Sequence, residues 1–336
     1  MATTQTELET EPRLTLKLRS DNEPKPEWLE TLEQEGWVVV KGVLSSEKAK
    51  TYEDAAYAFL ESFGMGFDRN DKTTWVPEQM PFFFKGGLFH RYGTGHEQFL
   101  WDIKQEPAVV DKFAKVWGTE KLVSSFDGCN ISLPIAGRDP NDFAFKPWPH
   151  VDQSPLVTGL HCVQGIMNLC PNGPEDGGLM LLKGSKALYA QLWEAFDDVK
   201  PPGGWNKGDR HDHTPEQMQW LIDNGCEYHK VCAEPGDLIL WDSRVVHYGA
   251  TPASDNPRIA SYVCYKPACL VTEDIAQKRR KAWEEKVQTS HDPITFRTNP
   301  RQAPEDHPTY DHPKVKDLQA PVLTDLGKKL AGLESW

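Results

Sequence analysis

The chain has 336 residues, of which 38% are hydrophobic and 10% aromatic, so it is long and apolar enough to bury a sizeable core. Its net charge of −13 argues against nucleic acid or an anionic membrane as a partner. The sequence contains no run of about 18 apolar residues, so we predict no membrane span. The seven cysteines show no C-x-x-C spacing, which predicts a reduced, cytoplasmic protein. The first ten residues lack both an apolar region and basic residues, which predicts that the chain has no secretory signal.

The first third of the chain is predicted to surround the core. Residues 1–25 are polar, acidic and proline-bearing, which predicts a loose arm. Residues 28–63 predict a lead-in of helix, glycine-bounded strand and second helix, the latter capped by a serine. Residues 64–100 are rich in Gly, Phe and Pro, and a loop of this length is uncommon without a function. Residues 106–118 have the apolar spacing of a short helix.

Residues 120–265 carry the predicted core. Short apolar runs bounded by Gly and Pro predict strands at 121–134, 159–170, 177–184, 238–247 and 259–265. We interpret His247 as the end of the strand that begins at 238. Residues 200–230 form an insert rich in Gly, His and Asp, with one helix near its end. The pattern predicts a mainly β fold with flanking helices around a double-stranded β-helix core, of the jelly-roll or cupin-like kind.

The last part, residues 266–336, is predicted to be a helix at 272–288 followed by an irregular, proline-rich tail. We expect the tail to pack against the barrel rather than to take part in chemistry. No credible boundary divides the chain, so residues 1–336 are predicted to form a single domain.

The most informative motif is His150-Val-Asp152, combined with the distant His247. Two imidazoles and one carboxylate form the facial triad that binds non-haem Fe(II) and leaves open positions for chemistry. In an extended segment, residues two apart point to the same face. A structural zinc site would more often use Cys or four closed ligands. We therefore predict that these three residues are both the metal ligands and the catalytic centre.

An H-x-D motif alone is a weak signal, because the segment 211–213 also reads His-Asp-His. That second cluster lies in the polar insert, and we interpret it as a solvated loop. Arg258 follows His247 by 258 − 247 = 11 residues, and a guanidinium there could clamp a carboxylate in bidentate fashion. The alternative for Arg258 is a surface salt bridge. For Arg244, three residues before His247, we favour a structural ion pair with Asp242.

Together these motifs give the chain its resemblance to the phytanoyl-CoA dioxygenase family of Fe(II)/2-oxoglutarate-dependent oxygenases. The ordered segments that carry it are 36–44, 150–152, 177–185, 235–237, His247 and Arg258. The resemblance implies Fe(2+), 2-oxoglutarate and O2 as cofactors, with Arg258 binding the C5 carboxylate of 2-oxoglutarate. It also implies a cofactor-binding position for Gln164, although a plain strand amide is almost as good an interpretation. At 183–186 the chain reads Lys-Gly-Ser-Lys where the family often has Pro-Gly-Ser/Thr-His.

The resemblance implies oxidation of a C–H bond by hydroxylation, desaturation or cyclisation, with release of succinate and CO2. Halogenases related to this family have a small residue at this ligand position, so that halide can bind the iron. Because the chain has Asp152 there, the resemblance disfavours halogenation. The excess of acidic over basic residues disfavours an acyl-CoA as substrate, because its polyphosphate requires a basic groove. We therefore expect the substrate to be a small organic molecule, such as a secondary metabolite or an amino-acid-like compound. The residues predicted to bind the substrate are Lys85, Arg91, Lys146 and Trp148.

Two other functions stay open at this point. One is a metal-dependent enzyme on the same fold that uses no 2-oxoglutarate, either an isomerase or an oxygenase that takes electrons from its substrate. The other is a non-catalytic jelly-roll binding protein, against which the intact triad argues. The sequence does not decide whether the chain forms a homodimer.

Overall fold

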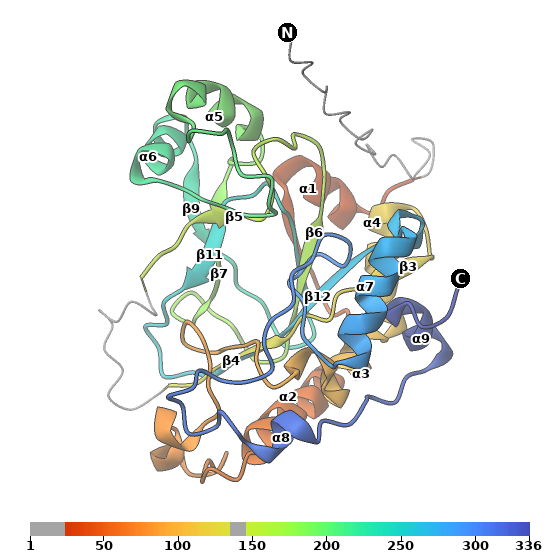
Figure 1. The fold of residues 1–336 in the computed structure, drawn as a ribbon. Helices are drawn as coiled ribbons and strands as arrows, with labels where there is room; N and C mark the ends of the chain where they lie inside the picture. Colours follow the sequence, from red (N-terminus) through yellow and green to blue (C-terminus); the bar gives the residue numbers. More distant parts are fainter. Residues whose placement is uncertain (1–23, 135–145) are drawn as a thin grey trace, which may run out of the picture.

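The computed structural model describes residues 24–134 and 146–336, and the predicted N-terminal arm lies almost wholly outside them. Two antiparallel sheets form the core (Figure 1). The larger runs in the order β1 (Trp37–Val40), β10 (Leu238–Asp242), β6 (Val163–Asn168), β12 (Arg258–Pro267), β4 (Cys129–Ser132) and β2 (Leu88–Phe89), with β3 (Leu122–Ser124) also paired to β12. The smaller runs in the order β8 (His211–Asp212), β5 (His150–Val151), β11 (His247–Ala250), β7 (Gly178–Lys183) and β9 (Glu227–Lys230).

Successive core strands alternate between the two sheets, as in a jelly roll: β5 belongs to the small sheet, β6 to the large one, β7 to the small one again. Further along the chain, β10 joins the large sheet, β11 the small sheet and β12 the large sheet. This alternation stacks the two sheets face to face and confirms the predicted double-stranded β-helix. Side chains from both inner faces therefore meet between the sheets.

Helices cover the outer faces of both sheets. On the side of the large sheet lie α1 (Glu27–Glu35), α2 (Ser46–Glu61), α3 (Gln98–Lys104), α4 (Pro107–Trp117), α7 (Glu273–Glu284), α8 (Pro313–Lys316) and α9 (Asp325–Ala331) (Figure 1). On the side of the small sheet lie α5 (Tyr189–Ala195) and α6 (Pro215–Asp223) (Figure 1). Short 3-10 turns occur at Lys72–Thr74, Pro77–Gln79, Thr94–His96, Asp197–Val199 and Ala268–Leu270. None of the described helices is both long and apolar enough to cross a membrane.

Side-chain capping explains where α2 begins, and aromatic packing explains how α4 is held against the large sheet. The Oγ of Ser45 accepts a hydrogen bond from the backbone N–H of Lys48 and so caps α2, as predicted. On the sheet side of α4, the ring of Phe113 contacts Tyr265 at 4.6 Å between centroids. The indole of Trp117 donates to the carbonyl of the same tyrosine at 2.7 Å. These contacts bury the helix face and lock α4 to β12.

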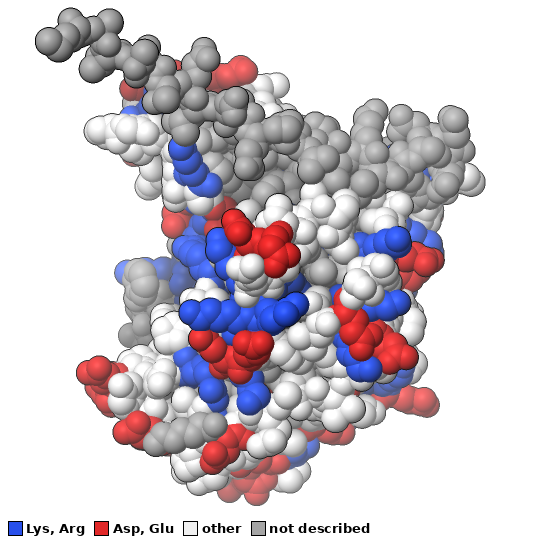
Figure 2. All heavy atoms as spheres, turned by 45° about the vertical axis from the view of Figure 1, so that its right-hand side comes forward, with Lys and Arg blue, Asp and Glu red and all other residues white. Residues whose placement is uncertain are grey.

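Acidic and basic side chains lie side by side on the face that Figure 2 shows. The exposed ion pairs among them contribute little to stability, because water and salt screen the attraction. The ion pair predicted between Arg244 and Asp242 is more buried than these. Arg244 Nη2 lies 2.5 Å from Oδ2 of the buried Asp242, which confirms the structural ion pair.

Three predicted elements differ from the structure. The strand expected at 121–134 is interrupted and becomes β3 and β4, because Phe126 leaves the sheet and donates its backbone N–H to Thr289 Oγ1 at 3.0 Å. The long segment 64–100 contains β2 and α3 as well as loops. His247 does not end the strand that begins at 238; it begins β11 in the other sheet. A turn intervenes, in which Asp242 Oδ1 accepts the backbone N–H of Arg244 at 3.0 Å.

Candidate metal centre and surrounding cavity

Two neighbouring strands of the small sheet bring the predicted ligands together. His247 on β11 is paired directly with His150 on β5, so the two imidazoles project from opposed positions on the same face. Their ring centroids are 4.3 Å apart. Asp152 lies two residues after His150, and its backbone N–H donates to Ser243 O at 3.1 Å. Of the described residues, these three form the group suited to a metal ion, with ligand atoms all within 4.8 Å of one another.

The backbone sets the orientation of both imidazoles. Nδ1 of His150 donates to the carbonyl of Trp148 at 3.0 Å, and Nδ1 of His247 donates to the carbonyl of Val245 at 2.9 Å. Since a carbonyl accepts a hydrogen bond, the proton resides on Nδ1 in each ring, and Nε2 keeps its lone pair for a metal. Both Nε2 atoms face the carboxylate of Asp152, at 3.5 Å from Oδ1 and 3.3 Å from Oδ2.

The electrostatics favour the protonation states that a metal requires. Burial, assisted by the neighbouring His247, holds the pKa of His150 well below its usual value, so this imidazole is neutral. Burial raises the pKa of Asp152, but His291, His150 and His247 outweigh that effect and hold it well below its usual value. A neutral imidazole and an ionised carboxylate are the forms that ligate Fe(II). The donor set and its protonation therefore fit this ion.

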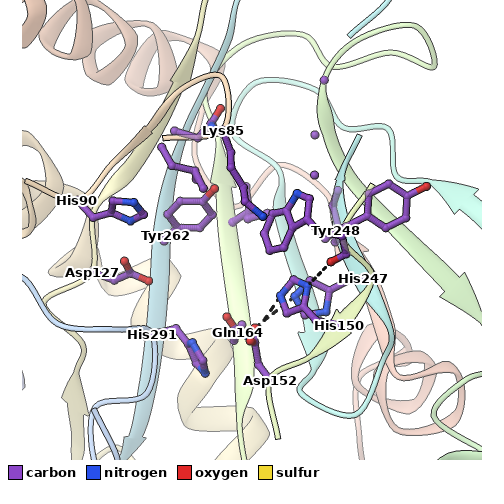
Figure 3. A pocket seen from close by; sticks show the side chains of 18 of the residues that line it. Lys85, His90, Asp127, His150, Asp152, Gln164, His247, Tyr248, Tyr262 and His291 are labelled. Carbon is purple, nitrogen blue, oxygen red and sulfur yellow. Dashed lines mark hydrogen bonds and ion pairs between the residues drawn. The ribbon is translucent and has the colours of Figure 1, made fainter. Parts of the chain in front are cut away.

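The centre opens into a cavity of about 340 Å³ between the two sheets (Figure 3). This volume is in the range of small-molecule sites. Both sheets contribute walls. The small sheet supplies His150, His247 and Tyr248, Asp152 follows directly after β5, and the large sheet supplies Gln164, Ile166, Trp241, Arg258 and Tyr262. The cavity thus combines apolar walls with a few converging polar groups, as expected of a binding site.

Arg258 begins β12 and lines this cavity. Although it is buried, it forms no ion pair with any carboxylate that the structure describes. Space beside it depends on Gly178, where a Cβ atom would lie 3.3 Å from Arg258 Nε and 2.8 Å from Asn172 Oδ1. A buried cation without a protein anion is costly unless a ligand supplies the charge. The surface salt bridge considered for Arg258 is therefore wrong.

Gln164, predicted to face a co-substrate, also lines the cavity, and its Nε2 donates to Asp152 Oδ2 at 2.7 Å. Its strand neighbour Asn168 faces elsewhere and donates to backbone carbonyls, among them Cys170 O at 2.6 Å. The two amides on one strand thus differ in role. Gln164 binds a carboxylate of the candidate metal centre, whereas Asn168 binds backbone carbonyls of a turn.

Two of the four predicted substrate-binding residues are brought together at the cavity. The Nζ of Lys85 lies 3.4 Å from the centroid of the Trp148 ring, and that ring stacks on His150 at 4.5 Å. Burial, together with the nearby Arg210, lowers the pKa of Lys85 to about 8. Arg91 and Lys146 do not line this cavity: Arg91 lies over Phe84, and Lys146 is exposed.

The second His/Asp cluster is not the solvated loop that we expected. His211 and Asp212 form β8, which pairs with β5, the strand that carries His150. His211 and His213 both contact Gln217 Oε1, at 3.1 and 3.3 Å, and pack against Trp193. The signal missed in the sequence was the surrounding tryptophans, which make half-buried histidines stable in a polar insert.

Sequence reasoning also missed part of the cavity wall. Residues from the C-terminal tail line the cavity, although packing alone was expected of this region. The cavity residues not anticipated from the sequence include Asp127, Tyr248, His291, Arg297 and Asn299, whereas Arg210 comes from the insert at 200–230 that we expected to line the site. Apart from the His-Asp-Pro sequence at 291–293, nothing local marks them, because they are assembled from segments distant in the chain.

The same centre and fold agree with the comparison to known proteins. The model of the phytanoyl-CoA dioxygenase (PhyH) family matches residues 32–260. The chain belongs to this family. It is 37% identical over 284 residues to the Ava biosynthesis cluster protein O of Aspergillus versicolor, which covers 82% of this chain and 90% of that protein. Both ligand strands and Arg258 fall within the matched region.

Solved structures show weaker similarity to this member of the phytanoyl-CoA dioxygenase family. The EctD protein of S. alaskensis with bound Fe is 13% identical, with a TM-score of 0.49 and coverage of 74% of this chain and 79% of that chain. The epimerase SnoN in complex with Fe3+, alpha ketoglutarate and nogalamycin RO is 15% identical, with a TM-score of 0.46 and coverage of 72% and 82%. The assignment to the family rests on the family model and the Aspergillus relative.

Proposed function

We propose that this protein is a non-haem Fe(II)/2-oxoglutarate-dependent dioxygenase that oxidises a C–H bond of a small organic molecule. The observation that carries the proposal is the pairing, in one cavity, of an open-faced His150–Asp152–His247 group with the unpaired cation Arg258. The triad accounts for the metal, and the guanidinium accounts for a dicarboxylate co-substrate. A non-catalytic binding protein would require neither.

Each side chain has a distinct part in this activity. His150, Asp152 and His247 would bind Fe(II), and Arg258 would hold the far carboxylate of 2-oxoglutarate. Bound iron and 2-oxoglutarate supply the oxidising power from O2, with succinate and CO2 released. The apolar walls exclude water from the reacting centre.

The substrate that we propose is a secondary metabolite or an amino-acid-like compound. The volume of about 340 Å³ suits such a molecule. The similarity to a biosynthesis cluster protein supports the same class. The pair Lys85–Trp148, at the cavity and next to His150, is our candidate contact for the substrate.

The first experiment is succinate release by the purified protein with Fe(II), 2-oxoglutarate and a library of such compounds. We expect turnover that requires 2-oxoglutarate and is abolished in Asp152→Ala, together with the bound iron. Asp223→Ala, which removes an exposed carboxylate at the end of α6 outside the cavity lining, is the matched control and should keep both. Turnover that persists without 2-oxoglutarate would identify the alternative enzyme class, and coupled turnover of a fatty acyl-CoA would overturn the proposed substrate class.

A further inference from the structure

A segment of the C-terminal tail, residues 289–299, forms part of the cavity wall, and we call it the strap. Its backbone closes on itself, because Ser290 N donates to Arg297 O at 2.8 Å and Asn299 N donates to Gln288 O at 2.9 Å. The strap residues that line the cavity are Thr289, Ser290, His291, Arg297 and Asn299. The family model ends at residue 260, so the strap lies beyond the matched region.

Asp292 anchors the strap to the large sheet. Its Oδ2 lies 2.5 Å from Nζ of Lys266 on β12 and 3.1 Å from Nε2 of His161. Its Oδ1 accepts the backbone N–H groups of Ile294 and Thr295, at 2.7 and 3.0 Å. A carboxylate that is buried, paired with charge and saturated with hydrogen bonds holds its backbone in one arrangement. The neighbouring residue, His291, is therefore fixed in position.

His291 itself makes no hydrogen bond to any residue that the structure describes. Its Nε2 is closed off from solvent and faces Oδ2 of Asp209 at 3.9 Å, too far for a hydrogen bond. Figure 3 shows the ring turned into the cavity near Asp152 and Gln164. The ring nitrogen without a hydrogen bond is therefore the one on the side of Asp209, and it is not the nitrogen that a ligand in the cavity would meet.

The polar insert and the strap meet at this point. Asp209 belongs to the insert at 200–230, and its Oδ1 lies 3.4 Å from Nη2 of Arg297 on the strap. Since the Nε2 side of His291 faces Asp209, the other ring nitrogen is left for a ligand. The imidazole is thus placed as a rigid donor within a cavity whose other walls come from both sheets and from loops, among them those of Lys85 and Arg210.

We propose that His291 is a substrate-binding residue that donates a hydrogen bond to an oxygen of the substrate. It would select small molecules that carry a carbonyl, hydroxyl or carboxylate oxygen beside the carbon to be oxidised. The inference rests on the proposed function and deepens it, because the triad and Arg258 account for the metal and the co-substrate but not for selection of the substrate.

The test compares wild type with His291→Phe, which keeps the ring but removes both nitrogens, and His291→Gln, which restores a donor. The matched control is Thr298→Val, an exposed strap residue outside the cavity lining. The probes are small carboxylic acids, amides and alcohols, each paired with an analogue that lacks the oxygen. Two readouts are compared: succinate release stimulated by each probe, and calorimetric binding of each probe to protein loaded with Mn(II) in place of Fe(II).

We expect wild type to prefer the oxygen-bearing probes and His291→Phe to lose that preference by at least about tenfold. Affinities for Mn(II) and 2-oxoglutarate should not change, His291→Gln should recover part of the preference, and Thr298→Val should match wild type. The proposal is overturned by an equal preference in wild type and His291→Phe, or by no preference in wild type. If no probe stimulates succinate release, the proposed function fails, and calorimetry alone decides on His291 by the same criteria.

Discussion

Gln164 and Asp152 are joined by a hydrogen bond of 2.7 Å from the amide Nε2 to the carboxylate Oδ2. The same oxygen faces His247 Nε2 at 3.3 Å, while Oδ1 faces His150. The amide lies on the large sheet and both imidazoles lie on the small one. One hydrogen bond across the cavity therefore fixes the plane of the carboxylate with respect to both rings.

We predict that Gln164→Leu weakens metal binding by about 10- to 100-fold, because the carboxylate loses the partner that orients it. Anaerobic titration with Fe(II), or calorimetry with Mn(II), measures the effect. Asn168→Leu is the control on the same strand: it removes hydrogen bonds to backbone carbonyls, so it should lower stability but leave the metal affinity of the folded protein unchanged. Equal metal affinity in Gln164→Leu and wild type would contradict the prediction.

Arg258→Met should raise the KM for 2-oxoglutarate at least tenfold, because no other unpaired guanidinium among the described residues of the cavity replaces it. Arg258→Lys should recover only part of the affinity, since an ammonium cannot form the bidentate contact. The comparison variant is Arg244→Met, whose arginine is already paired with Asp242. It should leave the KM for 2-oxoglutarate unchanged; a rise of the same size in both variants would show a general structural effect.

Lys85→Met should raise the KM for the substrate by about tenfold and leave that for 2-oxoglutarate unchanged. The change keeps the chain length but removes the ammonium over Trp148, a contact worth about 0.5–2 kcal/mol. Lys72 lies over Trp75 outside the cavity and gives the matched control, Lys72→Met. If Lys85→Met alters neither constant, the lysine does not contact the substrate. The same change at Lys146 tests the other lysine predicted from the sequence.

Lys104 makes stability depend on pH. Burial lowers its pKa from 10.5 to about 8, although its Nζ donates to the carbonyl of Asp127 at 2.5 Å. Between pH 8 and 10.5 the unfolded chain still holds a proton that the folded chain has released, so this lysine makes stability rise with pH. Denaturant unfolding should show wild type gaining up to about 3 kcal/mol relative to Lys104→Met across this range. The exposed Lys121, changed to Met, serves as control, and a flat difference for Lys104→Met would refute the prediction.

The grouping of His150, Asp152 and His247 was predictable because part of its signal is local in the sequence. His150 and Asp152 are two residues apart, and extended backbone alone puts them on one face. The structure brings His247 beside His150 as we expected, but it lies on a different strand from the one predicted. The run from 238 to 247 has two apolar stretches separated by Asp242-Ser-Arg244, and we interpreted it as one strand although this polar break is the turn by which the chain passes from one sheet to the other.

The wall of the cavity was not predictable in the same way. His291 reaches it because Asp292 is held by Lys266 and His161, residues from two other segments. Such contacts leave no periodic trace in the sequence. Arg91 and Lys146 were chosen for their nearness in sequence to plausible site segments, which does not determine the direction of a side chain. Lys85 does reach the cavity, at a backbone φ of 41° that its sequence context does not reveal.

The imidazoles of the metal centre are each oriented by the carbonyl two residues earlier in the same segment. With the proposed function and the proposed role of His291, reactivity and selectivity would be encoded in separable parts of the chain. The first would depend on two short strand segments whose own carbonyls orient the imidazoles, and the second on loops and a tail packed over them. Exchange of residues 289–299 for other sequences could then redirect the protein to new molecules without rebuilding its reactive centre. Such modularity would let a family keep one chemistry while its members diverge in what they act on.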